Sequence, residues 1–78
     1  MYNRVKEIRQ RKNLTLQKLA KKAGIGKSTL SEIERGVHTP SFETMIRISK
    51  ALGVSLDELF MIGDRENGKE KREGERKI

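Results

Sequence analysis

The sequence contains no cysteine, no tryptophan, one proline and one histidine in 78 residues. Without cysteine the fold can have neither a disulfide nor a thiolate metal site. With His38 as the only histidine, a metal site would need mainly carboxylates. The longest apolar run, residues 59–62, is far too short to cross a membrane, and the N-terminus lacks the apolar core of a signal peptide. These absences predict a small cytoplasmic protein that holds no metal or other cofactor.

Charge, by contrast, is abundant and unevenly distributed. The formal net charge is +7. Residues 1–35 hold ten Lys or Arg and three Glu, whereas residues 36–78 hold eight residues of each sign. A basic field attracts a polyphosphate and speeds its encounter, although it carries no sequence information. A thermostable charged surface is the alternative explanation. The asymmetry between the two halves favours DNA as the partner.

Residues 14–36 have the pattern of two short helices joined by a glycine turn. The first helix, over residues 16–23, is predicted by Thr15 as its N-cap and by Gly24, which stops a helix because glycine adopts the left-handed conformation freely. Ile25 is apolar within the turn, which indicates that it fills the corner between the helices. The inner face of the first helix consists of apolar residues spaced i, i+3, i+4 and i+7, namely Leu16, Leu19, Ala20 and Ala23.

The second helix of this unit is predicted over residues 27–35. Leu30 and Ile33 give its inner edge, and Glu34 falls close to that edge, where a carboxylate needs a partner because burying it unpaired is costly. Arg9 is the expected donor. The residues predicted to point outward are Ser28, Ser31, Glu32 and Arg35.

Three further helices complete the expected all-α, five-helix bundle. They are predicted over residues 3–12, with Val5 and Ile8 inward, over 42–52, and over 56–61, where Ser55 and Glu58 form a capping-box pattern. We expect one domain over residues 1–62, followed by a charged, disordered tail over 63–78 that has one apolar residue. The inner face predicted for helix 42–52 consists of Phe42, Met45, Ile46, Ser49 and Leu52.

In combination, these features resemble the Cro/repressor type of helix-turn-helix regulators, the XRE family. The resemblance implies a lambda-repressor-like DNA-binding domain, in which Arg9 and Glu34 form an internal ion pair. One departure is Leu16, where the family usually has a Gln that reaches a phosphate; Gln17 points about 100° away from that position. The matching features are Arg9, Leu19, Ala20 and Gly24, residues 33–36, Pro40 and Ser41, and residues 52–55.

The resemblance also implies that Lys27, Ser28 and Glu32 are the base-contacting residues. Lys27 can donate to guanine, Ser28 can contact several bases, and Glu32 can accept from cytosine N4. Alternatively, Glu32 forms only a surface ion pair with Arg35. Thr29 and Ser31 are the other expected contacts from the recognition helix. The residues expected to lie on phosphates are Thr15, Gln17, Arg35, His38 and Thr39.

The expected function is therefore regulation of transcription, as a repressor that binds an inverted-repeat operator as a homodimer. Two alternatives are an antitoxin of a toxin–antitoxin pair and a regulator controlled by an antagonist protein. An enzyme is not expected, because no nucleophile, base and orienting group can be assembled. Residues 24–29 imitate a phosphate-binding loop, but Lys21 stands where that motif needs its first glycine. The residues expected to pair two copies are Leu56, Phe60, Met61 and Ile62.

Overall fold

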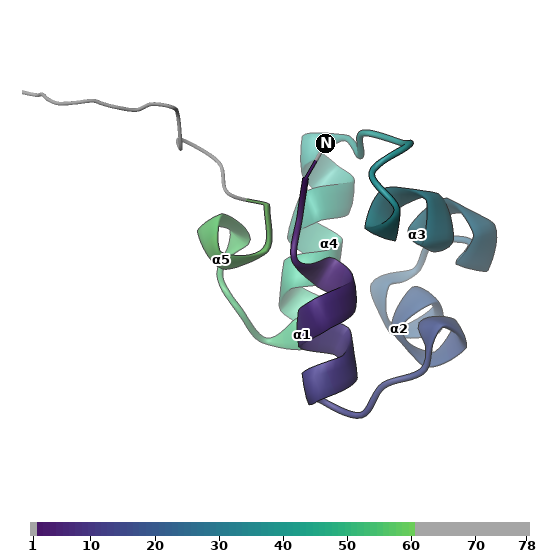
Figure 1. Ribbon diagram of the computed structural model, residues 1–78, viewed down its shortest axis with the longest axis vertical. Helices are drawn as coiled ribbons and strands as arrows, with labels where there is room; N and C mark the ends of the chain where they lie inside the picture. The colour runs from purple at the N-terminus through teal and green to yellow at the C-terminus, as the bar shows by residue number, and fades with distance from the viewer. Residues whose placement is uncertain (1, 61–78) are drawn as a thin grey trace, which may run out of the picture.

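The computed structural model describes residues 2–60, and the regular elements within them are all helices (Figure 1). The predicted bundle and its helix-turn-helix unit are thus confirmed. The predicted domain boundary at residue 62 and the predicted tail over 63–78 lie outside the described residues. No helix of residues 2–60 is long and apolar enough to cross a membrane. The helices are α1 (Val5–Arg11), α2 (Leu16–Ala23), α3 (Lys27–Glu34), α4 (Phe42–Leu52) and α5 (Leu56–Phe60).

The core is a single cluster of buried side chains drawn from all five helices. Helix α4 packs against α2 and α5, α2 packs against α3, and α1 contacts α5. Val5 and Ile8, which were expected to point inward from α1, are 0% and 2% exposed. Because each helix is short, its stability depends on this packing more than on its own propensity. The largest fully buried side chains are Val5, Leu19, Leu30, Ile33, Ile48, Leu52 and Leu59.

Hydroxyl side chains begin three of the helices. The Thr15 Oγ1 accepts from the Lys18 N–H at 3.1 Å, as predicted for the start of α2. The Ser41 Oγ accepts the Thr44 N–H at 3.2 Å at the start of α4. For α5, the Ser55 Oγ accepts from the Glu58 N–H at 3.1 Å, the hydroxyl half of the predicted capping box. These bonds satisfy amides that have no partner inside the helix.

Helices α1 to α4 all end in the same way. Each is followed by a residue in the left-handed region, with φ of 59° to 79°. In α2, the Gly24 N–H donates to the Lys21 carbonyl at 3.2 Å, and the Ile25 N–H donates to the Ala20 carbonyl at 3.0 Å. This pair of bonds defines a Schellman motif, and α1, α3 and α4 have the equivalent pair. The left-handed residues are Asn13, Gly24, Gly36 and Gly53.

An apolar residue follows the left-handed residue in each motif, where it can pack back onto its helix. Leu14, Ile25 and Val54 do so, since they pack against the core. Ile25 therefore fills the turn between α2 and α3, as predicted. Val37, after α3, differs because it is 68% exposed. The end of α3 is thus the one of these four helix ends whose apolar residue stays in solvent.

Two predictions about apolar faces need correction. Phe42 was expected on the inner face of α4, but it is 64% exposed, because the inner face is formed by Met45, Ile48, Ala51 and Leu52.

Helix α5 was expected to leave an exposed apolar patch for a second copy. Phe60 is only 2% exposed and Leu59 is fully buried, because the core takes up both side chains. Leu56 is half-buried against the same core. Phe60 is therefore not a surface residue of the folded chain. Met61 and Ile62 lie outside the described residues.

Candidate nucleic-acid interface

Helix α3 has one buried edge and one accessible side, which is the arrangement that a recognition helix requires. Leu30 and Ile33 are fully buried and fix the helix on the core. Lys27 and Ser28, in its first turn, are exposed. Thr29, Ser31 and Glu32 are half-buried, so they lie lower on the sides of the helix than Ser28 does. The predicted base-contacting and neighbouring residues thus form one accessible surface on α3.

The ion pair expected between Arg9 and Glu34 is present, and it ties the end of α3 to α1. The Arg9 Nε donates to the Glu34 Oε2 at 2.7 Å, and the Arg9 Nη2 donates to Oε1 at 3.2 Å. The two side chains are only 11% and 5% exposed. A third bond, from the Arg9 Nη1 to the Leu14 carbonyl at 2.8 Å, also fixes the segment that enters α2. Two parallel bonds hold the guanidinium and carboxylate in one geometry, so α3 has a defined position against α1.

Asn3 makes a second connection to α3, which the sequence did not suggest. Its Nδ2 donates to the Ile33 carbonyl at 2.8 Å, and its Oδ1 accepts from the Val5 N–H at 3.0 Å. One residue later, the Arg4 N–H donates to the Leu59 carbonyl at 2.8 Å. The N-terminal segment therefore connects the end of α3, the start of α1 and the end of α5.

The residues predicted to lie on phosphates are accessible at both ends of the unit. Thr15 and Gln17 are exposed at the start of α2, and Arg35, His38 and Thr39 are exposed after α3. Leu16 is half-buried and packs against the core. Leu16 therefore has a packing role at the position where the family usually has its phosphate-contacting Gln.

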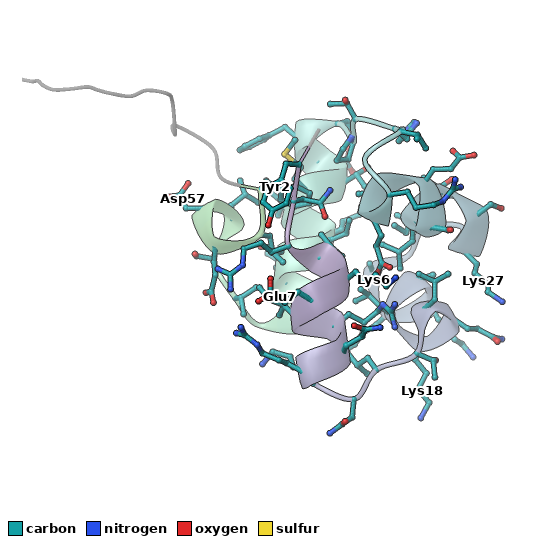
Figure 2. The ribbon with its side chains drawn as sticks, viewed as in Figure 1. Tyr2, Lys6, Glu7, Lys18, Lys27 and Asp57 are labelled. Carbon is teal, nitrogen blue, oxygen red and sulfur yellow. The ribbon has the colours of Figure 1, made fainter. Side chains whose placement is uncertain are left out.

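The acidic residues of α1 and α5 lie away from α2 and α3. In Figure 2, Lys18 and Lys27 project on the side of α2 and α3, whereas Asp57 projects on the opposite side, from α5. Glu7 pairs with Arg4 at 3.2 Å and with Arg11 at 2.8 Å. The hydrogen bond from Arg4 is the main cause that lowers the pKa of the Glu7 carboxyl. Lysines of α2 and α3 thus project on the side of the helix-turn-helix unit, opposite the acidic Asp57 of α5.

Basic residues also line a shallow, open depression between α2 and α4, with a volume of about 330 Å³. Arg47 is fixed there by bonds to the Glu43 Oε2 at 3.0 Å and to the Gly24 carbonyl at 3.4 Å. The sequence shows lysines between the buried residues of α2. It does not show that α4 lies beside these lysines. The depression is lined by Lys22, Ala23, Arg47, Lys50 and Ala51.

Comparison with known proteins agrees with this geometry. The model of the helix-turn-helix family matches residues 5–59, which include all five helices except Phe60, the last residue of α5. An uncharacterized HTH-type transcriptional regulator of Methanocaldococcus jannaschii is 38% identical over 66 residues, which are 85% of this chain and 100% of that protein.

The regulator SinR of Bacillus subtilis is 44% identical over 58 residues, which are 73% of this chain but only 52% of SinR. The crystal structure of SinR in complex with DNA matches with a TM-score of 0.65 and 42% identity, over 68% of this chain and 86% of that one. The complex of SinR with the SinI protein matches with a TM-score of 0.68 and 37% identity, over 82% of this chain and 60% of that one.

The restriction-modification controller protein C.AhdI of Aeromonas hydrophila matches with a TM-score of 0.71 and 32% identity, over 73% of this chain and 86% of that one. The residues matched by the family model include the whole of α2 and α3. The chain therefore belongs to the XRE family of helix-turn-helix transcriptional regulators and is a DNA-binding protein.

Proposed function

We propose that this chain is a repressor that binds an inverted-repeat operator as a homodimer, with α3 in the major groove of each half-site. The observation that carries the proposal is the bracing of α3. Its inner edge is buried and its end is fixed by Arg9, while Lys27 and Ser28 are exposed. A short helix held in this way can enter the major groove, with its N-terminal residues against base edges.

In this proposal the base contacts come from Lys27, Ser28 and Glu32. Lys27 donates to guanine O6 or N7, Ser28 contacts the neighbouring base, and Glu32 accepts from the N4 amino group of cytosine. Thr29 and Ser31 contact the sides of the groove.

Contacts with phosphates then fix the register of the helix in the groove. The Thr15 hydroxyl accepts from Lys18 within α2, so its own hydrogen remains available to donate to a phosphate. Gln17, Arg35, His38 and Thr39 supply the other contacts. The chain would act by binding alone, without a catalytic step.

Selection of bound duplexes from a random pool tests this function directly. We expect an enriched inverted repeat whose half-sites lie one turn of DNA, roughly 34 Å, apart. A salt titration with the selected duplex should give a steep loss of affinity, because bound phosphates release counterions. A pool that yields no enriched sequence, or an affinity that salt does not change, would contradict the proposal.

A second candidate is a regulator whose DNA binding is controlled by an antagonist protein. The likeness to the SinR–SinI complex favours it, because SinR is bound to a second protein in that structure. Pull-down from native lysate, followed by addition of the captured protein to the operator complex, tests this candidate. Release of the DNA would support control by an antagonist, whereas an unaffected complex would favour a freely acting repressor.

A further inference from the structure

The large apolar side chains that remain exposed in residues 2–60 are Tyr2, Val37 and Phe42, with exposures of 72%, 68% and 64%. They come from three separate segments: the N-terminus, the turn after α3 and the first residue of α4. In Figure 1 these segments lie together at the upper end of the molecule, and Figure 2 places Tyr2 there. We call these three side chains the apolar end.

Hydrogen bonds place two of these segments side by side. The side chain of Asn3, next to Tyr2, donates to the Ile33 carbonyl at 2.8 Å, at the end of α3. Val37 follows four residues later and belongs to the Schellman motif of α3, in which its N–H donates to the Glu32 carbonyl at 3.1 Å. The equivalent residues Leu14, Ile25 and Val54 pack against the core. Val37 therefore occupies the position from which an apolar residue packs onto its own helix, but its side chain remains available to a partner.

From these observations we infer that the apolar end is the surface through which two copies of this chain pair. This inference rests on the proposed function and assigns the dimer contact to Tyr2, Val37 and Phe42, in place of the buried Phe60. A contact about a two-fold axis brings the same patch of each copy together. Three large apolar side chains at one end supply the hydrophobic area that such a contact buries.

The charge distribution supports a second copy as the occupant. With a net charge of +7, two copies repel each other overall. Residues 36–42 are the longest run in the sequence without Lys, Arg, Asp or Glu, and they include both Val37 and Phe42. An uncharged patch suits a two-fold contact, because a charge near the axis would lie close to its own symmetry mate.

The position of the apolar end also suits the proposed operator. It adjoins the end of α3, so pairing there brings two recognition helices to either side of one axis. Helix α5 ends beside the same segment, since the Leu59 carbonyl accepts the Arg4 N–H at 2.8 Å. The next two residues of the sequence, Met61 and Ile62, are also apolar.

Two variants test the surface without disturbing the core. Val37→Asp and Phe42→Asp replace exposed side chains, and an aspartate at the first residue of α4 is favourable beside the positive end of the helix. Gln10→Asp, in the last turn of α1, is the matched control, because it adds the same charge on an exposed position outside the apolar end. Circular dichroism should give the folded signal for all three variants.

Each variant is then compared on the selected full operator and on a duplex that holds a single half-site. We expect Val37→Asp and Phe42→Asp to lower affinity for the full operator roughly tenfold or more, because the two linked binding events become independent. Affinity for the single half-site should match that of Gln10→Asp. Sedimentation should find two chains on the full operator for the parent and for Gln10→Asp, and only one for the other two variants at the same concentration.

Two outcomes would overturn the inference. One is an equal loss of affinity on the half-site and on the full operator, which would make these residues DNA contacts. The other is two chains on the operator for Val37→Asp and Phe42→Asp at the parent's affinity. If the parent selected no duplex at all, the proposed function would fail instead, and sedimentation of the free chains would still decide whether the apolar end pairs two copies.

Discussion

Replacing Arg9 by Met should remove most of the stability of the domain. The substitution leaves the Glu34 carboxylate, which is 5% exposed, without its two bonds from the guanidinium, and it leaves the Leu14 carbonyl without its bond from Nη1. Removing one partner of a buried pair typically costs about 3 to 5 kcal/mol. A domain of about 60 residues has a free energy of unfolding of roughly 3 to 9 kcal/mol, so the variant should be marginal at 25 °C.

Urea unfolding followed by circular dichroism measures this loss, and a double-mutant cycle assigns it to the pair. Glu34→Leu alone should also destabilise the domain, because it leaves a guanidinium that is 11% exposed without its carboxylate. The double variant Arg9→Met, Glu34→Leu should be more stable than either single variant, since no buried charge is left unpaired. A loss below about 1 kcal/mol for Arg9→Met, or a double variant less stable than both single ones, would refute this reasoning.

Three further predictions concern DNA reading and pH. Ser28→Ala or Glu32→Ala should change the preferred bases at a cost of roughly 1 to 3 kcal/mol per affected pair; repeating the duplex selection checks this, and an unchanged consensus for both would contradict it. Arg35→Ala should reduce the slope of log affinity against log salt by about 0.9 while keeping the consensus, so an unchanged slope would remove Arg35 from the phosphate contacts. The pKa of Glu7 is lowered chiefly by Arg4, so the stability from this pair is present above the ordinary pKa of 4.5 and is lost as the pH falls through the lower value. Acid titration of Glu7→Gln should therefore lose less stability than the parent over this range, and identical curves would contradict that assignment.

The bounds of a helix were predictable from the sequence where a capping residue begins it and a glycine ends it. The bounds of α2 and α4 agree with the predicted 16–23 and 42–52 because a hydroxyl cap begins each helix and a glycine follows it. The pairing of Arg9 with Glu34 was also predictable, since a carboxylate near the buried edge of α3 requires a cation.

Contacts that depend on tertiary packing were not predictable in the same way. On α4, Ile46 and Ile48 offer two overlapping apolar faces, and only the approach of α2 and α5 selects the face with Ile48 and leaves Phe42 exposed. The bond from Asn3 to the Ile33 carbonyl joins residues thirty positions apart. A backbone carbonyl has no signature in the sequence, so no pattern of residue types indicates such a bond.

The contact between the two ends of the described chain has a consequence for synthesis. Helix α1 contacts α5, and the Arg4 N–H donates to the carbonyl of Leu59. While the ribosome is still producing α5, the surface of α1 that receives it remains uncovered. Because α5 completes the packing around α1 through this long-range contact, we expect the nascent chain to stay incompletely folded until α5 has emerged. Binding to DNA would then begin only after synthesis of the whole domain.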